Sequence, residues 1–212
     1  FIMNLLVTGG YGFIASNFIN YYFPKNKKNL NVLVNVDCLY YAANKNNINE
    51  KIKKDEKYIF IKSNINNTDL ISYLLNKYNI THIIHFAAQT AVDASFYNSL
   101  QYTKDNVLAT HSFLEDCRVY GKIEKFIHVS TDEVYGDSNL DDKIPKNEQS
   151  ILCPNNPYSA TKAAAEMIVG SYARCYKMPI IITRGNNVYG PNQYPEKIIP
   201  KFIKLLKSNK KV

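Results

Sequence analysis

Short apolar runs alternate with longer amphipathic segments along this 212-residue chain, and no other feature constrains the fold as strongly. The apolar runs are predicted to be strands, at residues 5–8, 32–36, 58–61, 82–86, 125–130 and 180–183. Helices are predicted near residues 13–23, 69–78, 100–120, 158–176 and 195–206. Continuous apolar strands that alternate with helices indicate a parallel sheet with helices on both faces. The right-handed βαβ rule then predicts an α/β fold with a doubly wound, Rossmann-type sheet.

A glycine-rich turn joins the first predicted strand to the first predicted helix. Within the run from Val7 to Ala15, Gly9 and Gly12 permit a tight turn and let the backbone approach a pyrophosphate. The helix that follows offers free backbone N–H groups and the positive end of its dipole. Ala15 takes the third small-residue position, where close packing of helix against strand is still possible. This strand–turn–helix context predicts a dinucleotide-binding site.

Small and acidic residues follow two other predicted strands. Asp37 comes directly after the second strand, where a carboxylate can accept hydrogen bonds from adenosine ribose hydroxyls and would repel a 2′-phosphate. This position favours NAD over NADP, and the alternative role for Asp37 is to cap a turn. After the fourth strand, Ala87 and Ala88 would let a cofactor pass close to the backbone. Simple tight packing is the alternative explanation for these two alanines.

Tyr158 and Lys162 lie one helical turn apart near the start of a predicted helix, so their side chains share one face. A lysine ammonium beside a phenol favours the phenolate, which would let Tyr158 take up a proton near neutral pH. Four other Tyr and Lys pairs have this spacing, but they fall in loop, strand, surface-helix or proline-interrupted contexts. Only Tyr158 opens a strong helical segment soon after a strand that ends in polar side chains.

Two carboxyl side chains, Asp132 and Glu133, follow Ser130 and Thr131 at the end of the fifth predicted strand. They supply an acid and a base that a simple alcohol oxidation does not need. Neighbouring carboxyls in a poorly solvated cleft can have their pKa values pushed apart, so that one begins ionised and the other protonated. Plain solvated turn residues are the alternative interpretation of this pair.

The net charge of +8 does not by itself indicate a nucleic-acid binder. Many lysines cluster with asparagine in polar connections such as 25–28 and 51–54, and no aromatic-interleaved arginine patch accompanies them. We therefore expect no nucleic-acid partner, and residues 44–57 are predicted to form a loop or a short surface helix. The four histidines are scattered and the four cysteines lack paired metal-ligand spacing, which favours reduced thiols and no metal site.

Together these residues resemble the extended short-chain dehydrogenase/reductases, and specifically the nucleotide-sugar 4,6-dehydratases that act on dTDP-glucose or UDP-glucose. The resemblance covers nearly the whole chain, and its most specific element runs from Ser130 to Gly136. Its other markers are the segments 8–14, 85–88, 126–136, 157–162 and 184–200, with Asp37, Tyr41, Ala42, Asn106 and Val107. Related 4-epimerases resemble this fold but lack the Asp–Glu pair, and GDP-mannose dehydratases usually carry Ser in place of the Asp.

The resemblance implies a mechanism with named catalytic residues. Tyr158 removes the proton of the sugar 4-hydroxyl while NAD⁺ takes the C4 hydride, and Lys162 lowers the Tyr158 pKa and binds the nicotinamide ribose. Thr131 forms a hydrogen bond near the 4-oxygen. Glu133 then removes the C5 proton and Asp132 protonates the departing 6-hydroxyl. The hydride returns to C6, so the implied product is a 4-keto-6-deoxy sugar for deoxysugar synthesis, for example of rhamnose.

The resemblance also implies cofactor and substrate contacts. It places Asn187 and Lys197 at the substrate diphosphate, in a loop after a strand end where ligands bind in such sheets. The implied cofactor-binding residues are Gly9, Gly12, Phe13, Ile14, Asp37, Asn64, Ile65, Ala87, Ala88, Thr90, Asn106, Tyr158 and Lys162. The chain departs from the family pattern at 90–95, where a His and an Arg are absent, and at Asn64, which replaces an Asp. These departures leave sugar and base selectivity open, including the choice between dTDP and UDP.

Residues 1–190 are expected to form an NAD-binding domain with the catalytic residues, and 191–212 to begin a substrate-binding C-terminal part that is incomplete. A strand would normally follow the last predicted helix, so the sequence is expected to be a piece of a longer protein. By resemblance, the helices near 100–120 and 158–176 would pair across a homodimer. No apolar run is long enough to span a membrane and no signal peptide is visible, so a cytoplasmic protein is expected.

Three alternatives to the dehydratase remain from the residues alone. A nucleotide-sugar 4-epimerase has the same fold, and in that enzyme Glu133 would be far less decisive. A non-catalytic NAD-binding scaffold would bind the cofactor without turnover. A nucleic-acid binder would show a steep dependence of affinity on salt.

Overall fold

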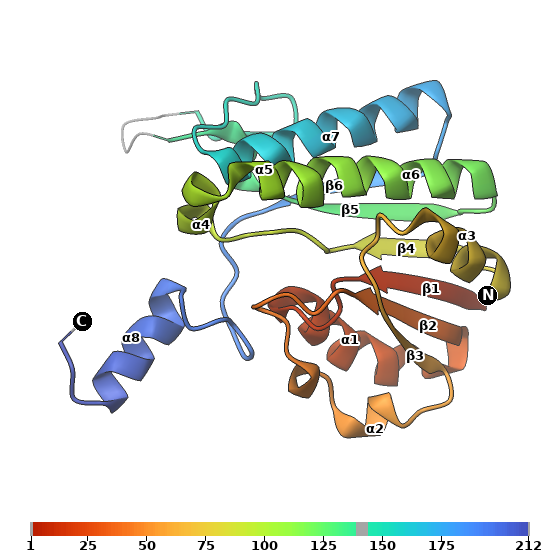
Figure 1. The fold of residues 1–212 in the computed structure, drawn as a ribbon, viewed down its shortest axis with the longest axis horizontal. Helices are drawn as coiled ribbons and strands as arrows, with labels where there is room; N and C mark the ends of the chain where they lie inside the picture. The colour runs from red at the N-terminus through yellow and green to blue at the C-terminus, as the bar shows by residue number, and fades with distance from the viewer. Residues whose placement is uncertain (1, 139–143, 212) are drawn as a thin grey trace.

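A computed structural model describes residues 2–138 and 144–211 of the chain. Within these residues, six strands form one parallel sheet in the order β3-β2-β1-β4-β5-β6 (Figure 1). The strands are β1 (Met3–Thr8), β2 (Leu30–Asp37), β3 (Tyr58–Lys62), β4 (His82–His85), β5 (Lys125–Thr131) and β6 (Ile180–Gly185). The sheet grows outwards from β1 in both directions, so the prediction of a doubly wound, Rossmann-type fold is confirmed.

Helices connect the strands close to the predicted positions. The α-helices are α1 (Phe13–Asn26), α2 (Glu50–Lys53), α3 (Thr68–Lys77), α4 (Val92–Tyr97), α5 (Ser99–Tyr102), α6 (Ala109–Tyr120), α7 (Pro157–Cys175) and α8 (Ile198–Lys207). Shorter helical turns are η1 (Lys27–Asn29), η2 (Lys45–Asn47), η3 (Thr103–Leu108) and η4 (Asp132–Tyr135). The segment 44–57 contains η2 and α2, which agrees with the predicted short surface helix. Among the described residues, no helix combines the length and apolarity needed to cross a bilayer.

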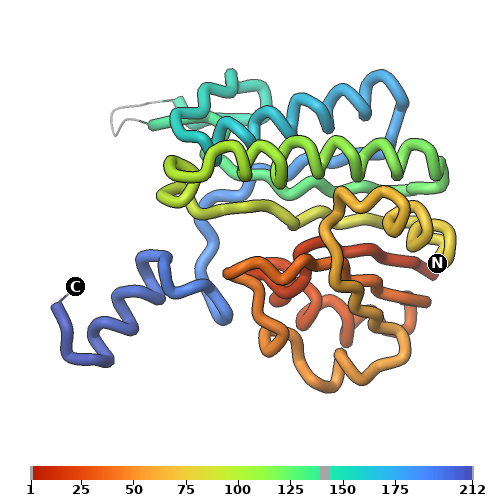
Figure 2. The backbone as a smooth tube through the Cα atoms, viewed as in Figure 1, coloured from red at the N-terminus to blue at the C-terminus, as the bar shows by residue number. Residues whose placement is uncertain are grey.

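The helices cover the two faces of the sheet unequally. On one face, α3, α6 and α7 pack over a core that includes Phe113 and Phe126 (Figure 1). On the other face, α1 packs on a core that includes Ile19 and Leu33. Strand β6 alternates half-buried and exposed residues, and Ile181 is 45% exposed, so the second face is open at this edge. Helix α8 projects away from this body (Figure 2), and none of its residues is buried.

The strand register brings the carboxyl ends of the strands to one edge of the sheet. Thr8 pairs with Val36 on one side and with His85 on the other, and Thr131 pairs with Gly185. Because all pairs are parallel, the loops that follow the strands leave from this edge together. The predicted glycine turn, Asp37 and the Asp132–Glu133 pair therefore lie at the same edge.

The helix predicted near 100–120 runs from Ser99 to Tyr120, but its hydrogen bonding changes along its length. Residues Thr103–Leu108 form a π-helical turn between α5 and α6. Such turns are rare and often lie at functional sites. Asn106, a residue of this turn, is buried.

Candidate active site

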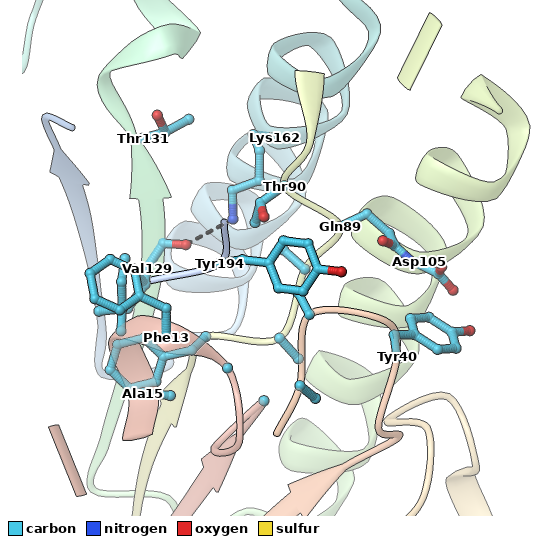
Figure 3. A pocket seen from close by; sticks show the side chains of 18 of the residues that line it. Phe13, Ala15, Tyr40, Gln89, Thr90, Asp105, Val129, Thr131, Lys162 and Tyr194 are labelled. Atoms are coloured by element: carbon cyan, nitrogen blue, oxygen red, sulfur yellow. Dashed lines mark hydrogen bonds between the residues drawn. The ribbon is translucent and has the colours of Figure 1, made fainter. Parts of the chain in front are cut away.

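A cavity of about 390 Å³ opens at the carboxyl edge of the sheet. Its walls are the turns after β1, β2 and β4, the end of β5, the start of α7 and the segment after β6 (Figure 3). The strand order reverses between β1 and β4, and open α/β sheets bind ligands at such a switch point. Most of the predicted site residues line it, namely Gly9, Gly12, Phe13, Ile14, Asp37, Asn64, Ile65, Ala87, Ala88, Thr90, Thr131, Glu133, Tyr158, Lys162, Asn187 and Lys197.

Close packing around the first turn leaves no room for a side chain at Gly9 or Gly10. Gly9 has a φ of +69°, and a Cβ there would lie 2.9 Å from the Cα of Ala87. The amide of Gly10 donates a hydrogen bond to the Oδ1 of Asn35 at 3.0 Å, and a Cβ on Gly10 would lie 2.1 Å from that oxygen. Gly12 is the N-cap of α1 and offers no side-chain cap, and the first residues of this helix line the cavity. The N–H groups of the first turn of a helix have no partners within the helix, so this end is suited to an anion.

Asp37 both caps a turn and lines the cavity. Its two carboxylate oxygens accept hydrogen bonds from the backbone amides of Tyr11, at 2.9 Å, and Leu39, at 2.7 Å. Burial raises the pKa of Asp37, and the two amide hydrogen bonds act in the opposite direction. Since each carboxylate oxygen has a second lone pair, the side chain can also accept hydrogen bonds from a bound ligand.

Tyr158 and Lys162 lie in the first turns of α7. A reciprocal cap between Asn156 and Ser159, with Pro157 at the first helical position, fixes where this helix begins. The Lys162 ammonium donates a hydrogen bond to the main-chain oxygen of Val129 at 2.8 Å (Figure 3). Burial lowers the pKa of Lys162 to about 8, although Glu166 acts against this shift.

The Tyr158 pKa differs from the sequence-based prediction. It is raised, first by burial and then by the negative charge of Glu133, while a hydrogen bond with Thr131 lowers it. Desolvation and a carboxylate therefore dominate the Tyr158 pKa in the chain alone, and they favour the protonated phenol. The lowering of this pKa by Lys162 stays a prediction.

Thr131 organises the turn that carries the two carboxyls. Its hydroxyl accepts a hydrogen bond from the amide of Glu133 at 3.2 Å and lies 3.3 Å from the Oδ1 of Asp132. Glu133 lines the main cavity with Tyr158, whereas Asp132 lines a neighbouring cavity beside Arg184. The two cavities share Glu133 in their walls, so the carboxyls lie at the boundary between them.

Asn106 lies behind the cavity wall. Its side-chain amide donates hydrogen bonds to the main-chain oxygen of Gln89 and to the hydroxyl of Thr161, each at 3.0 Å. Its Oδ1 accepts a hydrogen bond from the amide of Gln89 at 2.7 Å. Gln89 itself lines the cavity, so Asn106 acts on the cavity through the loop after β4.

Several lining residues were not predicted from the sequence. Tyr40, Gln89, Asp105 and Tyr194 all reach the cavity from loops or from the π-helical turn (Figure 3). For Tyr40 and Gln89 the available signal was their position soon after strand ends, and Asp105 and Tyr194 had no such signal. Across the cavity, the rings of Tyr41 and Tyr194 meet edge to face at 5.2 Å.

The segment after β6 is held against the rest of the cavity. The Tyr41 hydroxyl donates a hydrogen bond to Glu196 at 3.2 Å, and the Lys197 ammonium lies 3.4 Å from the main-chain oxygen of Thr90. The predicted diphosphate residues Asn187 and Lys197 therefore lie on the same cavity as the glycine turn. Within 2–138 and 144–211, no group of three or more His, Cys, Asp or Glu residues could hold a metal ion.

Comparison with known proteins agrees with this geometry. The family model described as GDP-mannose 4,6 dehydratase matches residues 6–212. An Arabidopsis thaliana trifunctional UDP-glucose 4,6-dehydratase/UDP-4-keto-6-deoxy-D-glucose 3,5-epimerase/UDP-4-keto-L-rhamnose-reductase, RHM3, is 51% identical over 210 residues, which are 98% of this chain and 31% of that protein. The dTDP-D-glucose 4,6-dehydratase of Dictyostelium discoideum is 48% identical over 219 residues, covering 100% of this chain and 50% of its own length.

A solved structure of a 4,6-dehydratase also matches this chain. The dTDP-glucose 4,6-dehydratase DesIV from Streptomyces venezuelae, crystallised with NAD and TYD bound, superposes with a TM-score of 0.90 at 35% identity. The match covers 98% of this chain and 63% of DesIV. The chain thus spans less than two thirds of the length of these relatives. The chain belongs to the GDP-mannose 4,6-dehydratase family, which confirms its predicted resemblance to nucleotide-sugar 4,6-dehydratases.

Proposed function

We propose that this chain carries the cofactor-binding and catalytic part of an NAD-dependent nucleotide-sugar 4,6-dehydratase. The proposed reaction converts UDP-glucose or dTDP-glucose to its 4-keto-6-deoxy derivative. One observation carries this proposal: a carboxyl side chain, Glu133, and the phenol of Tyr158 line the same cavity beside the glycine turn. An oxidation at C4 needs only the phenol, whereas an elimination also needs a base for C5 and an acid for the 6-hydroxyl.

The residues of the cavity fit NAD. The uncapped start of α1 and the Gly9–Gly12 turn suit a pyrophosphate, and Asp37 keeps lone pairs for ribose hydroxyls. The Lys162 ammonium uses one N–H to donate to the Val129 oxygen, and two N–H donors remain. These two donors could bind the hydroxyls of a nicotinamide ribose. When bound, NAD supplies a reversible oxidation at C4, which acidifies the proton on C5.

The chain's own residues perform the proton transfers. Tyr158 accepts the proton of the 4-hydroxyl, and because its pKa is raised in the chain alone, this role requires the bound cofactor and the Lys162 charge to favour the phenolate. Thr131, which hydrogen-bonds with Tyr158, orients the 4-oxygen. Glu133 removes the C5 proton, and Asp132 in the adjoining cavity protonates the leaving 6-hydroxyl.

The remaining assignments concern the substrate and the architecture. Asn187 and Lys197 would bind the diphosphate, because a lysine and an amide on the cavity wall can both donate to phosphate oxygens. Residues 1–190 would form the cofactor-binding domain, and 191–212 would begin a substrate-binding part. The apolar side of α8 supports this division, since Ile198, Phe202 and Leu206 are all exposed.

We also propose a homodimer and a cytoplasmic location. The outward sides of the α5–α6 helical stretch and of α7 expose Leu100, Leu108 and Met167, and these helices lie side by side (Figure 1). A second copy would cover these apolar side chains. The four cysteines are free, as expected in a reducing compartment.

The test uses the full-length protein with NAD and either UDP-glucose or dTDP-glucose in heavy water. Mass spectrometry of the sugar nucleotide should show loss of one water and gain of deuterium at C5. Glu133→Gln should lower the rate of water loss by at least about a hundredfold, since general base catalysis contributes on that scale. Glu56→Gln, which removes an exposed carboxylate, is the matched control and should retain activity.

Two other results would contradict the dehydratase. Conversion of glucose to galactose without a change in mass would indicate a 4-epimerase. Binding of NAD without any reaction of either substrate would indicate a non-catalytic scaffold or a different sugar nucleotide.

A further inference from the structure

Arg184 on β6 links three parts of the chain. Its Nε and Nη2 atoms donate to the Oε2 of Glu166 on α7, at 2.9 and 2.8 Å. Its Nη1 donates to the Tyr135 hydroxyl at 2.8 Å and to the main-chain oxygen of Glu148 at 3.3 Å. The guanidinium carbon also lies 4.9 Å from the centre of the Tyr135 ring, which adds a cation–π contact.

Two of the three partners of Arg184, Glu166 and Tyr135, belong to the two halves of the proton-transfer apparatus. Glu166 lies one helical turn after Lys162 on α7. Tyr135 is the last residue of η4, the turn that begins with Asp132 and Glu133. One guanidinium therefore joins the helix that carries the phenol and the lysine to the turn that carries the acid and the base.

Stability alone gives little reason for this ion pair. The Glu166 side chain is only 1% exposed, and its second oxygen, Oε1, has no hydrogen-bond partner among the described residues. Desolvation of buried charges offsets most of their attraction, and apolar residues of similar size are often as stable. A fixed geometry is what such a pair provides, because a guanidinium holds its donors in one plane.

The turn η4 needs such a fixed point. It is a 3-10 helix of four residues, and its carboxyls are held at the N-terminal end by the Thr131 hydroxyl. At its C-terminal end Gly136 has a φ of +78°, and the main chain of residue 153 packs against it so closely that a Cβ would clash with the Cys153 oxygen. Between these ends, the Tyr135 hydroxyl connects the turn to β6 through its hydrogen bond with Arg184.

We propose that Arg184 is a positioning residue, which holds the Asp132–Glu133 turn in a fixed place relative to α7 through its bonds to Tyr135 and Glu166. This role rests on the proposed dehydratase function for its catalytic consequence. The physical link itself does not depend on that function. A lysine at 184 could not replace it, since an ammonium cannot reach Glu166 and Tyr135 with the planar fork of donors.

Tyr135→Phe in the full-length protein is the sharpest test, because it removes only the hydroxyl and leaves the buried pair intact. Tyr120→Phe is the matched control, since it removes a tyrosine hydroxyl that has no hydrogen-bond partner in the described part of the chain. The first readout is hydrogen–deuterium exchange of a peptide covering 130–138. We expect exchange about tenfold faster there in Tyr135→Phe, with no change in α7 and none in the control.

The second readout is steady-state kinetics of water loss. We expect kcat to fall about tenfold in Tyr135→Phe with KM and NAD affinity unchanged, because ground-state binding does not use the turn. Arg184→Lys should show the same split with a larger fall in kcat.

The two readouts separate the two proposals. Unchanged exchange in Tyr135→Phe would overturn the positioning role, whether or not the protein is a dehydratase. Faster exchange with an unchanged kcat would overturn the catalytic consequence of the positioning role. An inactive wild-type protein would overturn the dehydratase function, while the exchange data would still decide whether Arg184 holds the turn.

Discussion

The ammonium of Lys162 and the main-chain oxygen of Val129 are 2.8 Å apart, so the lysine is hydrogen-bonded to the strand β5. Lys162 is buried, and burial lowers its pKa to about 8. In an unfolded chain a lysine has a pKa of about 10.4. The folded protein therefore binds fewer protons than the unfolded chain between about pH 8 and pH 10.4, and this difference can be measured.

Lys162→Met should stabilise the protein at pH 7 by on the order of 1–3 kcal/mol, because it removes a buried charge. In the wild type the cost of that charge is fully present below pH 8 and disappears as the pH rises through 10.4. The difference between variant and wild type should therefore shrink over this range. Urea unfolding of both proteins at pH 7 and pH 10 measures this difference in the free energy of unfolding. Lys62→Met, at an exposed lysine, is the control and should show no such trend.

Asp116 on α6 is a buried carboxyl whose Oδ2 has no hydrogen-bond partner among the described residues. Burial, with Glu115 and Asp69 nearby, raises its pKa to about 6. The raised pKa means that the fold favours the protonated form, so this group adds stability as the pH falls from about 6 to about 4. Asp116→Asn should be more stable than the wild type at pH 7 by on the order of 1–3 kcal/mol, and equal to it near pH 4. Melting curves of the variant and the wild type between pH 4 and pH 7 test this prediction. An unchanged melting temperature at pH 7 would contradict it.

Gly10 is predicted to tolerate no side chain. Gly10→Ala would place a Cβ 2.1 Å from the Asn35 oxygen, which already accepts the Gly10 amide hydrogen bond. We expect a loss of roughly 2–4 kcal/mol in the free energy of unfolding, by overpacking and by a broken buried hydrogen bond. Gly170→Ala in α7, where a Cβ would meet nothing within 4 Å, should instead be neutral or stabilising by up to about 1 kcal/mol.

Asn106 is predicted to support NAD binding without touching the cofactor. Asn106→Asp keeps an acceptor for the Gln89 amide but loses both donor bonds, to the Gln89 oxygen and to Thr161. We expect NAD affinity, measured by calorimetry, to fall about tenfold as the loop after β4 shifts. The control Asn76→Asp removes an exposed amide donor on α3 and should leave the affinity unchanged. Equal affinities in both variants would show that Asn106 does not act on the cavity.

The site residues in turns and at strand ends could be predicted from the sequence, because local sequence patterns determine where strands end and where turns form. Gly9 needs its positive φ. Asp37 ends β2 and Glu133 lies two residues after β5, so their common edge follows from the parallel order. Contacts between distant loops have no such signal. Tyr194 reaches the cavity by an edge-to-face contact with Tyr41, a pairing over 150 residues apart in the chain that no local pattern encodes.

The pKa shifts of the site residues could not be predicted from the sequence either. The Tyr158 pKa depends on burial and on the direction in which Glu133 points, and both are properties of the folded cavity. The π-helical turn at Thr103–Leu108 is a second example, because an apolar pattern predicts a helix but not its hydrogen-bonding register.

The open edge at β6 has a practical consequence for handling the chain. In the described residues β6 pairs only with β5, and its other side presents unpaired backbone N–H and C=O groups beside the exposed Ile181. An uncovered strand of this kind is a template for adding strands from other molecules. The β6 edge is therefore the expected site of association between copies of residues 1–212 at high protein concentration.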